Sequence, residues 1–367
     1  MIIFSLIITS CINDTTAPGS KITEDGFVCP EPTHREDLTS SRINLYLPEN
    51  SVPLEILECF KLQYNVKVVV DEFDNSEQMF AVVSASGKKY DLVLARDMFI
   101  PLLAGQGFLK KLDKLKIPSV ENINSTYLNL EFDPLNQYSI PWRAGMTGLA
   151  FNAAAGKTAP QSWGDLWNDE YSGRILYPND QRTTLAVVLL ALGYDVNTTD
   201  PVELAFAKDK LAELFLKVRL FESSSTGKAL VNGEADLGIL DSEEAIFAAR
   251  EFESIHYIFP SEGAILWQDN WVLLNEAQNT DVAYAFLNYV LRPDVSWMLL
   301  DEFRYTNPNS AALKYAQVNY PEIYTSYMNS QIVNPPDGAF LQGHRILDVG
   351  ETTGIYDDIW VEVIVGD

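Results

Sequence analysis

The stretch EGAILWQDNW, from Glu262 to Trp271, carries the pattern on which both the fold and the ligand site depend. It indicates a β-strand, because it is apolar, has a glycine near its start and continues into VLL. Side chains on a strand alternate between its two faces, so Trp267, Asp269 and Trp271 share one face. The stretch therefore raises the question of why a carboxylate lies between two indoles.

Two interpretations of Asp269 are open from this stretch alone. The first is an edge strand whose carboxylate lies in water, as charged side chains usually do. The second is a binding site for a cation, because an indole face attracts an ammonium group and a carboxylate neutralises it. The rest of the chain has to decide between them.

Length and charge exclude some classes of protein. The chain has 367 residues, which is long for one hydrophobic core and predicts two domains. Its formal net charge of -25 argues against a nucleic-acid partner, because phosphates would be repelled. The same charge suits a cationic ligand, but it also suits plain solubility in an external medium.

The first eleven residues, MIIFSLIITSC, resemble a bacterial lipoprotein signal in which Cys11 becomes the lipidated first residue. A transmembrane helix needs about 20 apolar residues, so this run is too short to be one. A buried N-terminal strand is the alternative. We expect a signal over residues 1–11, followed by a polar tether over residues 12–41.

Two further cysteines remain after lipidation of Cys11. Cys29 lies in the predicted tether and Cys59 in the first predicted helix. An even pair outside the cytoplasm favours a disulfide, although two free thiols are the alternative. We predict that Cys29 and Cys59 are joined in the mature protein.

Strands and helices alternate along the rest of the chain. The first unit predicts strands over 43–47, 66–73 and 90–95, with helices over 53–64, 76–86 and 98–106. The second predicts strands over 147–152, 173–177 and 235–240, with helices over 183–193, 201–218 and 280–291. Alternation of this kind builds a mostly parallel α/β sheet that is covered on both faces.

Motifs for catalysis and metal binding are missing from the sequence. The three histidines, His34, His256 and His344, are far apart and lack the spacing of metal ligands. There is no P-loop, dinucleotide fingerprint or nucleophile elbow. We therefore expect no enzyme activity, no catalytic residue, no metal and no cofactor.

Six stretches occur together in one order: FDPLNQYSIPW (132–142), SWGDLWNDEYSGRI (162–175), ALGYDVNTTDP (191–201), EGAILWQDNW (262–271), LNYVLRPDV (287–295) and YTNPNSAAL (305–313). In this combination the chain, from residue 43 to its end, resembles the periplasmic spermidine/putrescine-binding proteins, the polyamine branch of the ABC-transporter solute receptors. The resemblance implies a type II periplasmic-binding-protein fold, with two α/β lobes, a hinge and a ligand cleft. It implies a first lobe over 42–144 and 268–313, and a second over 145–267 and 314–367.

The resemblance also implies a function. We expect a monomeric extracytoplasmic receptor, in the periplasm or on the outer face of the cell membrane, that delivers a small amine to an ABC permease and its ATPase. Its contact with the membrane would be through a lipid anchor only. A sensory or scaffolding lipoprotein that keeps the fold without transport is the alternative.

The family grips its ligand with aromatic rings and carboxylates, and this chain keeps only part of that set. The resemblance implies ligand contacts at four matching positions, which are Asp180, Trp267, Asp269 and Tyr305. It implies further cleft positions at which this chain departs from the family, which are Pro48, Ser51, Arg96, Met98, Thr183 and Asp241. We take Asp180, Trp267, Asp269, Tyr305, Arg96, Asp241, Ser51 and Met98 as the candidate ligand-binding residues, with Asp269 as the principal amine anchor.

The departures change the expected ligand. With several rings missing, spermidine should bind roughly tenfold to a thousandfold more weakly, because each methylene contact is worth about 0.8 kcal/mol. Arg96 has two interpretations: a salt bridge between the lobes of an emptied cleft, or a grip on a ligand carboxylate. In the second case the ligand is an amine that also carries a carboxylate or a hydroxyl.

Overall fold

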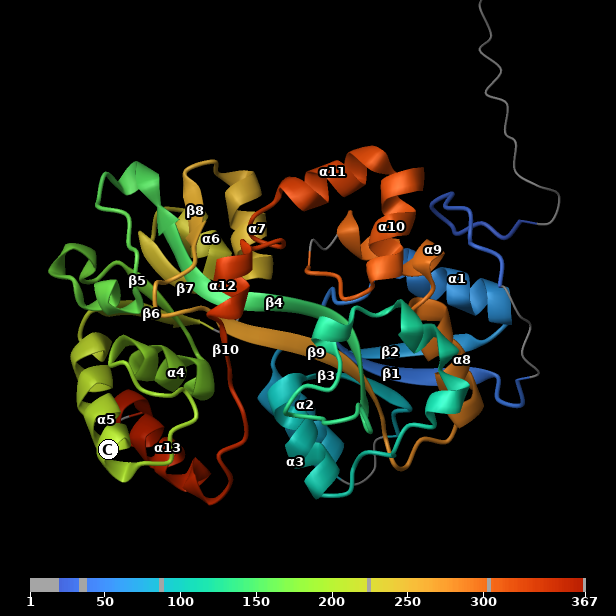
Figure 1. Cartoon of the computed structure of the whole chain (residues 1–367), viewed down its shortest axis with the longest axis horizontal. Coiled ribbons are helices and arrows are strands. Elements are labelled where there is room, and N and C mark those ends of the chain that lie inside the picture. Colours follow the sequence, from blue (N-terminus) through green and yellow to red (C-terminus); the bar gives the residue numbers. More distant parts are fainter. Residues whose placement is uncertain (1–19, 33–37, 86–88, 223–225, 302–304, 366–367) are drawn as a thin grey trace, which may run out of the picture.

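The computed structural model describes residues 20–32, 38–85, 89–222, 226–301 and 305–365. The predicted signal and the lipidation site Cys11 lie outside these residues. Two lobes lie side by side along the longest axis, and two long strands, β4 and β9, run from one lobe to the other (Figure 1). The predicted two-lobed α/β fold is confirmed.

Ten strands make up the sheet in the described residues. They are β1 (Arg42–Pro48), β2 (Lys67–Phe73), β3 (Leu92–Arg96), β4 (Ser139–Asn152), β5 (Ile175–Pro178), β6 (Val218–Glu222), β7 (Leu237–Asp241), β8 (Ile255–Ile258), β9 (Ile265–Leu273) and β10 (His344–Arg345). The α-helices are α1 (Leu54–Tyr64), α2 (Ser76–Ser84), α3 (Ile100–Gly105), α4 (Gln181–Ala191), α5 (Pro201–Phe215), α6 (Thr226–Val231), α7 (Ser242–Glu251), α8 (Thr280–Val290), α9 (Pro293–Ser296), α10 (Ser310–Asn319), α11 (Pro321–Asn329), α12 (Asp337–Leu341) and α13 (Thr353–Trp360).

The strand order explains how one sheet serves two lobes. The order is β2-β1-β3-β9-β4-β7-β5-β6, with β10 on β9 and β8 on β4. Strands β1, β2 and β3 are parallel within the first lobe, and β5, β6 and β7 are parallel within the second. The central pairs β3–β9, β9–β4 and β4–β7 are antiparallel. The pairs among β1, β2 and β3 and among β5, β6 and β7 are therefore parallel, as expected, whereas the described pairs that involve β4 or β9 are antiparallel, except β9–β10.

Strand β9 shows why the quoted stretch decides the fold. Its nine residues are all buried, so it is a central strand rather than an edge strand. Along its predicted face, Ile265 packs in the core of the second lobe and Trp271 in the core of the first. Trp267 and Asp269 come between these two residues, at the junction of the lobes.

The last helices differ from the expected division of the chain. Helices α10 and α11 pack on the first lobe, where Ala316 and Tyr327 share a core with Phe60 of α1. The predicted change of lobe at residue 314 falls inside α10, and Ala312 and Ala316 of this helix lie one turn apart in that same core. Helix α13 packs on the second lobe, where Tyr356 contacts the cluster around Leu185.

Part of the predicted polar tether is folded against the first lobe. Cys29 is buried and forms a disulfide with Cys59 of α1, with a Cα–Cα distance of 5.2 Å, which is the predicted pairing. Arg292 donates a hydrogen bond to the carbonyl of Glu31 at 2.7 Å, and the backbone N–H of Thr39 donates to Asp281 at 2.6 Å. The described residues 20–32 and 38–41 are therefore packed structure, and the tether expectation is wrong for them.

Candidate functional site

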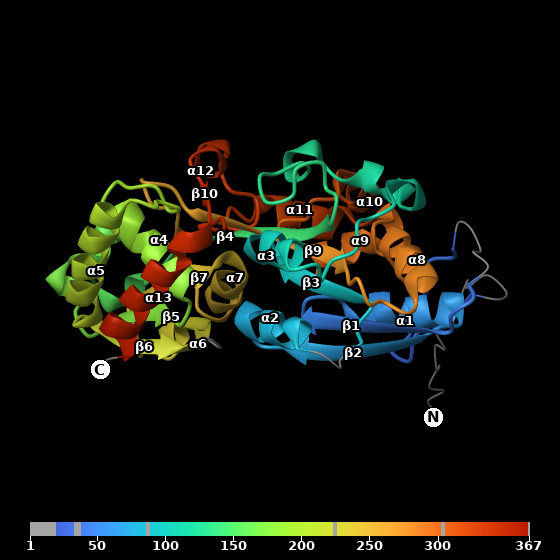
Figure 2. The same ribbon diagram turned by 90° about the horizontal axis from the view of Figure 1, so that it is seen from below.

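A cleft of about 650 Å³ lies between the lobes. Its walls come from the loop after β1, the first turn of α2 and the end of β3 in the first lobe. The second lobe contributes the start of α4, the end of β7 and one face of α7, and Figure 2 shows α2 and α7 on the two sides of the junction. Most of these segments follow the carboxyl ends of parallel strands, the usual place for a ligand in open α/β sheets.

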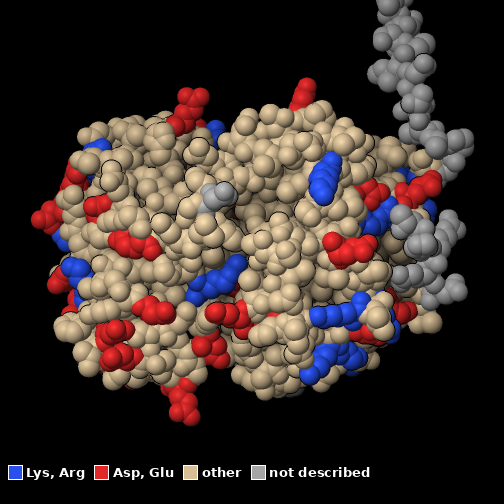
Figure 3. All heavy atoms as spheres, in the orientation of Figure 1, with Lys and Arg blue, Asp and Glu red and all other residues tan. Residues whose placement is uncertain are grey.

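The cleft is acidic. Acidic side chains are spread over both lobes of the molecule (Figure 3), and the cleft lining follows the same trend. Its carboxylates are Glu49, Asp74, Glu77, Asp180, Asp241, Glu243, Glu244 and Asp269. Among the described lining residues, Arg96 and Arg143 are the cationic ones. A concave surface lined mainly by one sign of charge attracts ligands of the opposite sign.

Asp269 lies in a row of charges that the sheet register creates. Arg96 of β3 and Arg143 of β4 are both paired opposite Asp269 of β9, one on each side. Residues directly opposite one another on neighbouring strands have their Cβ atoms about 5 Å apart, so these side chains meet. Arg143 Nε donates to Asp269 Oδ2 at 2.7 Å, and Arg96 Nε donates to Oδ1 at 3.4 Å. The cationic partners of Asp269 are therefore two arginines of the same chain.

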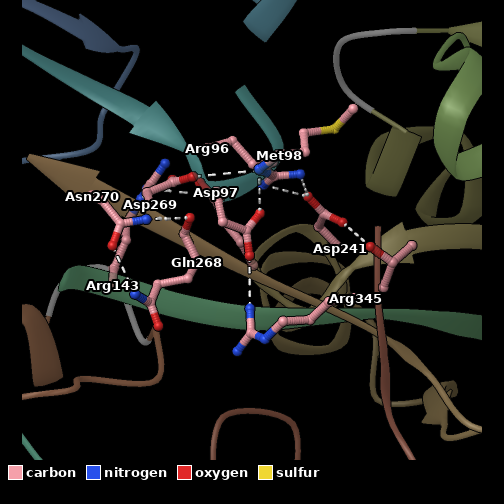
Figure 4. Close-up of polar contacts among 11 residues, drawn as sticks. Arg96, Asp97, Met98, Arg143, Asp241, Gln268, Asp269, Asn270 and Arg345 are labelled. Atoms are coloured by element: carbon pink, nitrogen blue, oxygen red, sulfur yellow. Dashed lines mark hydrogen bonds and ion pairs between the residues drawn. The ribbon is translucent and has the colours of Figure 1, made fainter. Parts of the chain in front are cut away.

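Arg96 also joins the two lobes. Its Nη1 and Nη2 donate to one carboxylate oxygen of Asp241, at the end of β7, at 3.1 and 3.0 Å (Figure 4). Thr147 lies opposite Asp241 in the β4–β7 pair and donates to its other oxygen at 2.5 Å. This is the interlobe salt bridge of the first interpretation of Arg96.

The two aromatic residues that match the family lie beneath these guanidinium groups. Arg96 is stacked on Trp267, with its Cζ 4.4 Å from the ring centroid, and Arg143 is stacked on Tyr305 at 4.0 Å. The indole lies so close to β4 that a Cβ on Gly145 would come within 2.3 Å of a ring atom. Both rings are buried and neither lines the cleft.

The predicted ligand residues therefore fall into two groups. Arg96, Asp180, Asp241 and Asp269 line the cleft together. The other four are Trp267, Tyr305, Ser51 and Met98, and they do not line it. Of these, Ser51 is buried, with its carbonyl accepting from Trp142 Nε1 at 3.1 Å, and Met98 packs against core clusters of both lobes.

Several lining residues were not among the predicted ligand residues. Glu77 of α2 is one, and Glu243 and Phe247 of α7 are others. The signal that could have found them is position: α2 and α7 follow directly after β2 and β7, at the carboxyl edge of each parallel sheet. On α7, Glu243 and Phe247 are four residues apart and so lie on one face.

Burial raises the pKa of several carboxylates in and beside the cleft. Loss of hydration in the cleft, and then the charge of Asp180 on the other lobe, raise the pKa of Glu77. Burial raises the pKa of Glu243 despite the nearby Arg143. Burial also raises the pKa of Asp97, beside the cleft, to about 6, although Arg345 donates to this carboxylate at 2.7 Å.

The described residues lack two other kinds of feature. They contain no group of three or more side chains arranged to hold a metal ion. None of their helices combines the length and the hydrophobicity that spanning a membrane requires.

Known proteins resemble this chain over most of its length. Residues 55–325 match the family model described as bacterial extracellular solute-binding protein. The spermidine/putrescine-binding periplasmic protein of Escherichia coli is 32% identical over 317 residues, which are 86% of this chain and 89% of that protein. The putrescine-binding periplasmic protein SpuD of Pseudomonas aeruginosa is 30% identical over 310 residues, 77% of this chain and 83% of that protein.

Solved structures agree with this assignment. The substrate-binding protein PotD of the spermidine/putrescine ABC transporter of Streptococcus pneumoniae superposes with a TM-score of 0.77 at 27% identity, over 89% of this chain and 99% of that one. The TpPotD lipoprotein of Treponema pallidum also gives 0.77, at 26% identity, over 88% and 99% of the two chains. The resemblance found in the sequence is thereby confirmed. The chain belongs to the bacterial extracellular solute-binding proteins.

Proposed function

We propose that this chain is the extracytoplasmic receptor of an ABC importer and that it binds a small amine-containing ligand in the cleft between its lobes. The observation that carries the proposal is the acidic lining of that cleft, to which both lobes contribute carboxylates. Relatives whose names specify spermidine or putrescine bind amines, and this supports the same ligand class here. The receptor would hand the ligand to a permease driven by an ATPase.

We also propose that the protein lies outside the cytoplasm. The disulfide between Cys29 and Cys59 suits an oxidising compartment outside the cytoplasm. A lipid anchor on Cys11 would hold the receptor at the membrane, and the lipoprotein relative of Treponema pallidum supports this address. The receptor would work as a monomer, because its ligand site is formed by the two lobes of one chain.

Closure of the cleft would occur by bending of β4 and β9. β9 pairs with β3 of the first lobe, β4 pairs with β7 of the second, and these two long strands pair with each other around Gly145 and Trp267. A hinge here keeps the proposed lobe boundaries at 144/145 and 267/268. Bending at this point would separate Arg96 from Asp241 and so widen the ligand site.

Plain polyamines would bind weakly. Trp267 and Asp269, the family's ring and carboxylate, are engaged by Arg96. A polyamine ammonium would have to displace this guanidinium or share the same carboxylate with it, and the two positive charges would repel each other. A ligand with one amine and a different second group avoids this conflict.

A second function is favoured by one observation. The Arg96–Asp241 bridge joins the two lobes through the chain's own side chains. A protein that stays closed in this way would suit a sensory or scaffolding lipoprotein that keeps the fold without transport.

A thermal-shift panel separates the two proposals. The purified protein would be heated with polyamines, amino acids, betaines and amino-alcohols, and positive ligands would then be measured by calorimetry. The receptor proposal expects at least one amine to raise the melting temperature and to bind with a micromolar dissociation constant. Failure of every amine in the panel would refute it and favour the second function.

A further inference from the structure

The deep end of the cleft contains a buried hydrogen-bond donor that lacks an acceptor. Arg143 lines the cleft, and only 3% of its surface is exposed. Its Nε is bonded to Asp269, and its guanidinium lies on Tyr305. Its Nη1, however, makes no hydrogen bond within the described part of the chain and lies 3.9 Å from the nearest oxygen of Glu243. A buried N–H without an acceptor is costly, so a ligand atom that accepts from it would be favoured.

The charges nearby restrict what that acceptor is. Three carboxylates, Asp241, Asp269 and Glu243, surround the two guanidinium groups of Arg96 and Arg143 at this end. A ligand carboxylate would add a fourth anion to a group in which negative charge is already in excess. A ligand ammonium has no lone pair to accept from Nη1 and would be repelled by both arginines. A neutral oxygen, from a hydroxyl or a carbonyl, can accept from Nη1 and adds no charge to this group.

The outer part of the cleft has the opposite character. Glu77 of the first lobe and Asp180 of the second line it, and burial, followed by the charge of Asp180, raises the pKa of Glu77. Glu49 and Asp74 line the same cleft. Phe247 adds a ring there and is 44% exposed. An ammonium group between these carboxylates would relieve their repulsion and contact an aromatic face.

We propose that the ligand is a monocation that carries an amine at one end and a neutral oxygen at the other, as an amino-alcohol or an amino-amide does. The oxygen accepts from Arg143 Nη1, and the ammonium lies between Glu77 and Asp180. This inference rests on the proposed receptor function and names the ligand class of the same cleft. It retains the hydroxyl of the sequence-based expectation and rejects the carboxylate.

A series of ligands that differ only at one end tests the inference without any mutation. Calorimetry would compare 4-aminobutan-1-ol, butane-1,4-diamine, 4-aminobutanoate and butylamine, and then the same end groups on chains of two to five carbons. At the best chain length the amino-alcohol should bind at least about tenfold more tightly than the other three, a factor that corresponds to about 1.4 kcal/mol. Tighter binding of the diamine or of the aminocarboxylate would overturn the inference.

Two variants test which residue binds each end of the ligand. Arg143→Lys keeps the positive charge but removes Nη1, so the ratio of the amino-alcohol affinity to the butylamine affinity should fall towards one. Asp180→Asn should weaken all the amines about equally. Asp200→Asn is its matched control, because both aspartates cap a helix N-terminus, α4 and α5 respectively, and Asn caps equally well. An amino-alcohol that keeps its full advantage with Arg143→Lys would contradict the assignment of its oxygen.

The outcomes also separate this inference from the function on which it rests. Binding of amines with no preference for a neutral oxygen refutes the ligand class and leaves the receptor proposal standing. If only amines without any oxygen bind tightly in the thermal-shift panel, the ligand class is also refuted and the receptor proposal still stands. Absence of binding throughout both sets refutes the receptor proposal and the inference together.

Discussion

Arg96 at the end of β3 and Asp241 at the end of β7 are hydrogen-bonded across the two lobes, at 3.0 and 3.1 Å. Both are among the cleft positions at which the sequence departs from the pattern of the family that it resembles. In the sequence they are two unrelated departures, 145 residues apart. In the structure each provides the charge that the other needs, and their contact lies across the cleft that a ligand must enter.

The bridge predicts the conformation of the ligand-free protein. Arg96→Gln should shift it towards an open form, because a charge-assisted contact about a quarter exposed stabilises closure by about 1–2 kcal/mol. The ratio of closed to open molecules would then fall roughly tenfold. Small-angle X-ray scattering would show a larger radius of gyration. Arg174→Gln is the control, because Arg174 pairs with Asp236 within the second lobe. An unchanged radius in Arg96→Gln would show that the bridge does not hold the lobes.

Replacing Arg96 and Asp241 together should improve polyamine binding. In Arg96→Ser with Asp241→Trp, the guanidinium over Trp267 is removed and Asp269 loses one of its two partners. Spermidine affinity, measured by calorimetry, should rise by roughly ten- to a hundredfold over that of the parent, from one or two recovered ring and carboxylate contacts. Tight spermidine binding by the parent would show that Arg96 leaves the family site free.

Asp269→Asn should destabilise the protein, and this reverses the expectation from sequence. As a ligand anchor in an open cleft, Asp269 could be changed with little effect on the free protein. The structure instead buries it between Arg96 and Arg143, 97% shielded from solvent. Removing one partner of a buried ion pair costs about 3–5 kcal/mol, so the melting temperature should fall by roughly 5–10 °C. A melting temperature within about one degree of the parent would contradict this account.

The disulfide gives a prediction for the described part of the tether. Cys29 and Cys59 close a loop of 30 residues, which in the chain-entropy model stabilises the fold by roughly 3–4 kcal/mol. Cys29→Ser with Cys59→Ser should therefore unfold at lower denaturant concentration with a similar slope. Thiol labelling of the unfolded, unreduced parent should find neither cysteine reactive. Labelling of both would show that the bond is absent in the protein.

The limits of sequence reasoning follow from distance along the chain. Alternation within one strand is local, and it placed Trp267 and Asp269 on one face correctly. The partners of Asp269 are set by the strand order β3-β9-β4, which brings together residues 173 and 126 positions apart. No local pattern encodes that order, so Asp269 was predicted as a free anchor. The packing of residues 20–32 against the first lobe and the position of α10 on that lobe depend on similar long-range contacts.

Asp97 should make stability depend on pH between about 4 and 6. Burial raises its pKa from 3.8 to about 6 in the folded protein, so the native state keeps this proton over a range in which the unfolded chain has released it. Stability rises with pH only where the unfolded state binds more protons, and here the native state binds more. The contribution of Asp97 therefore falls as the pH rises from about 4 to about 6, by about 1–3 kcal/mol, and is constant above that.

The groups that face Asp97 fix the sign of this effect. Arg345 and Arg96 favour its charged form, whereas burial and the charge of Asp269 oppose it, with burial the largest influence. Denaturant unfolding at pH 4, 5, 6 and 7 should show that Asp97→Asn loses less stability over this range than the parent. Asp209→Asn, an exposed change on α5, should keep the slope of the parent and so serves as the control. Equal slopes for Asp97→Asn and the parent would mean that Arg345 outweighs burial and keeps Asp97 ionised throughout.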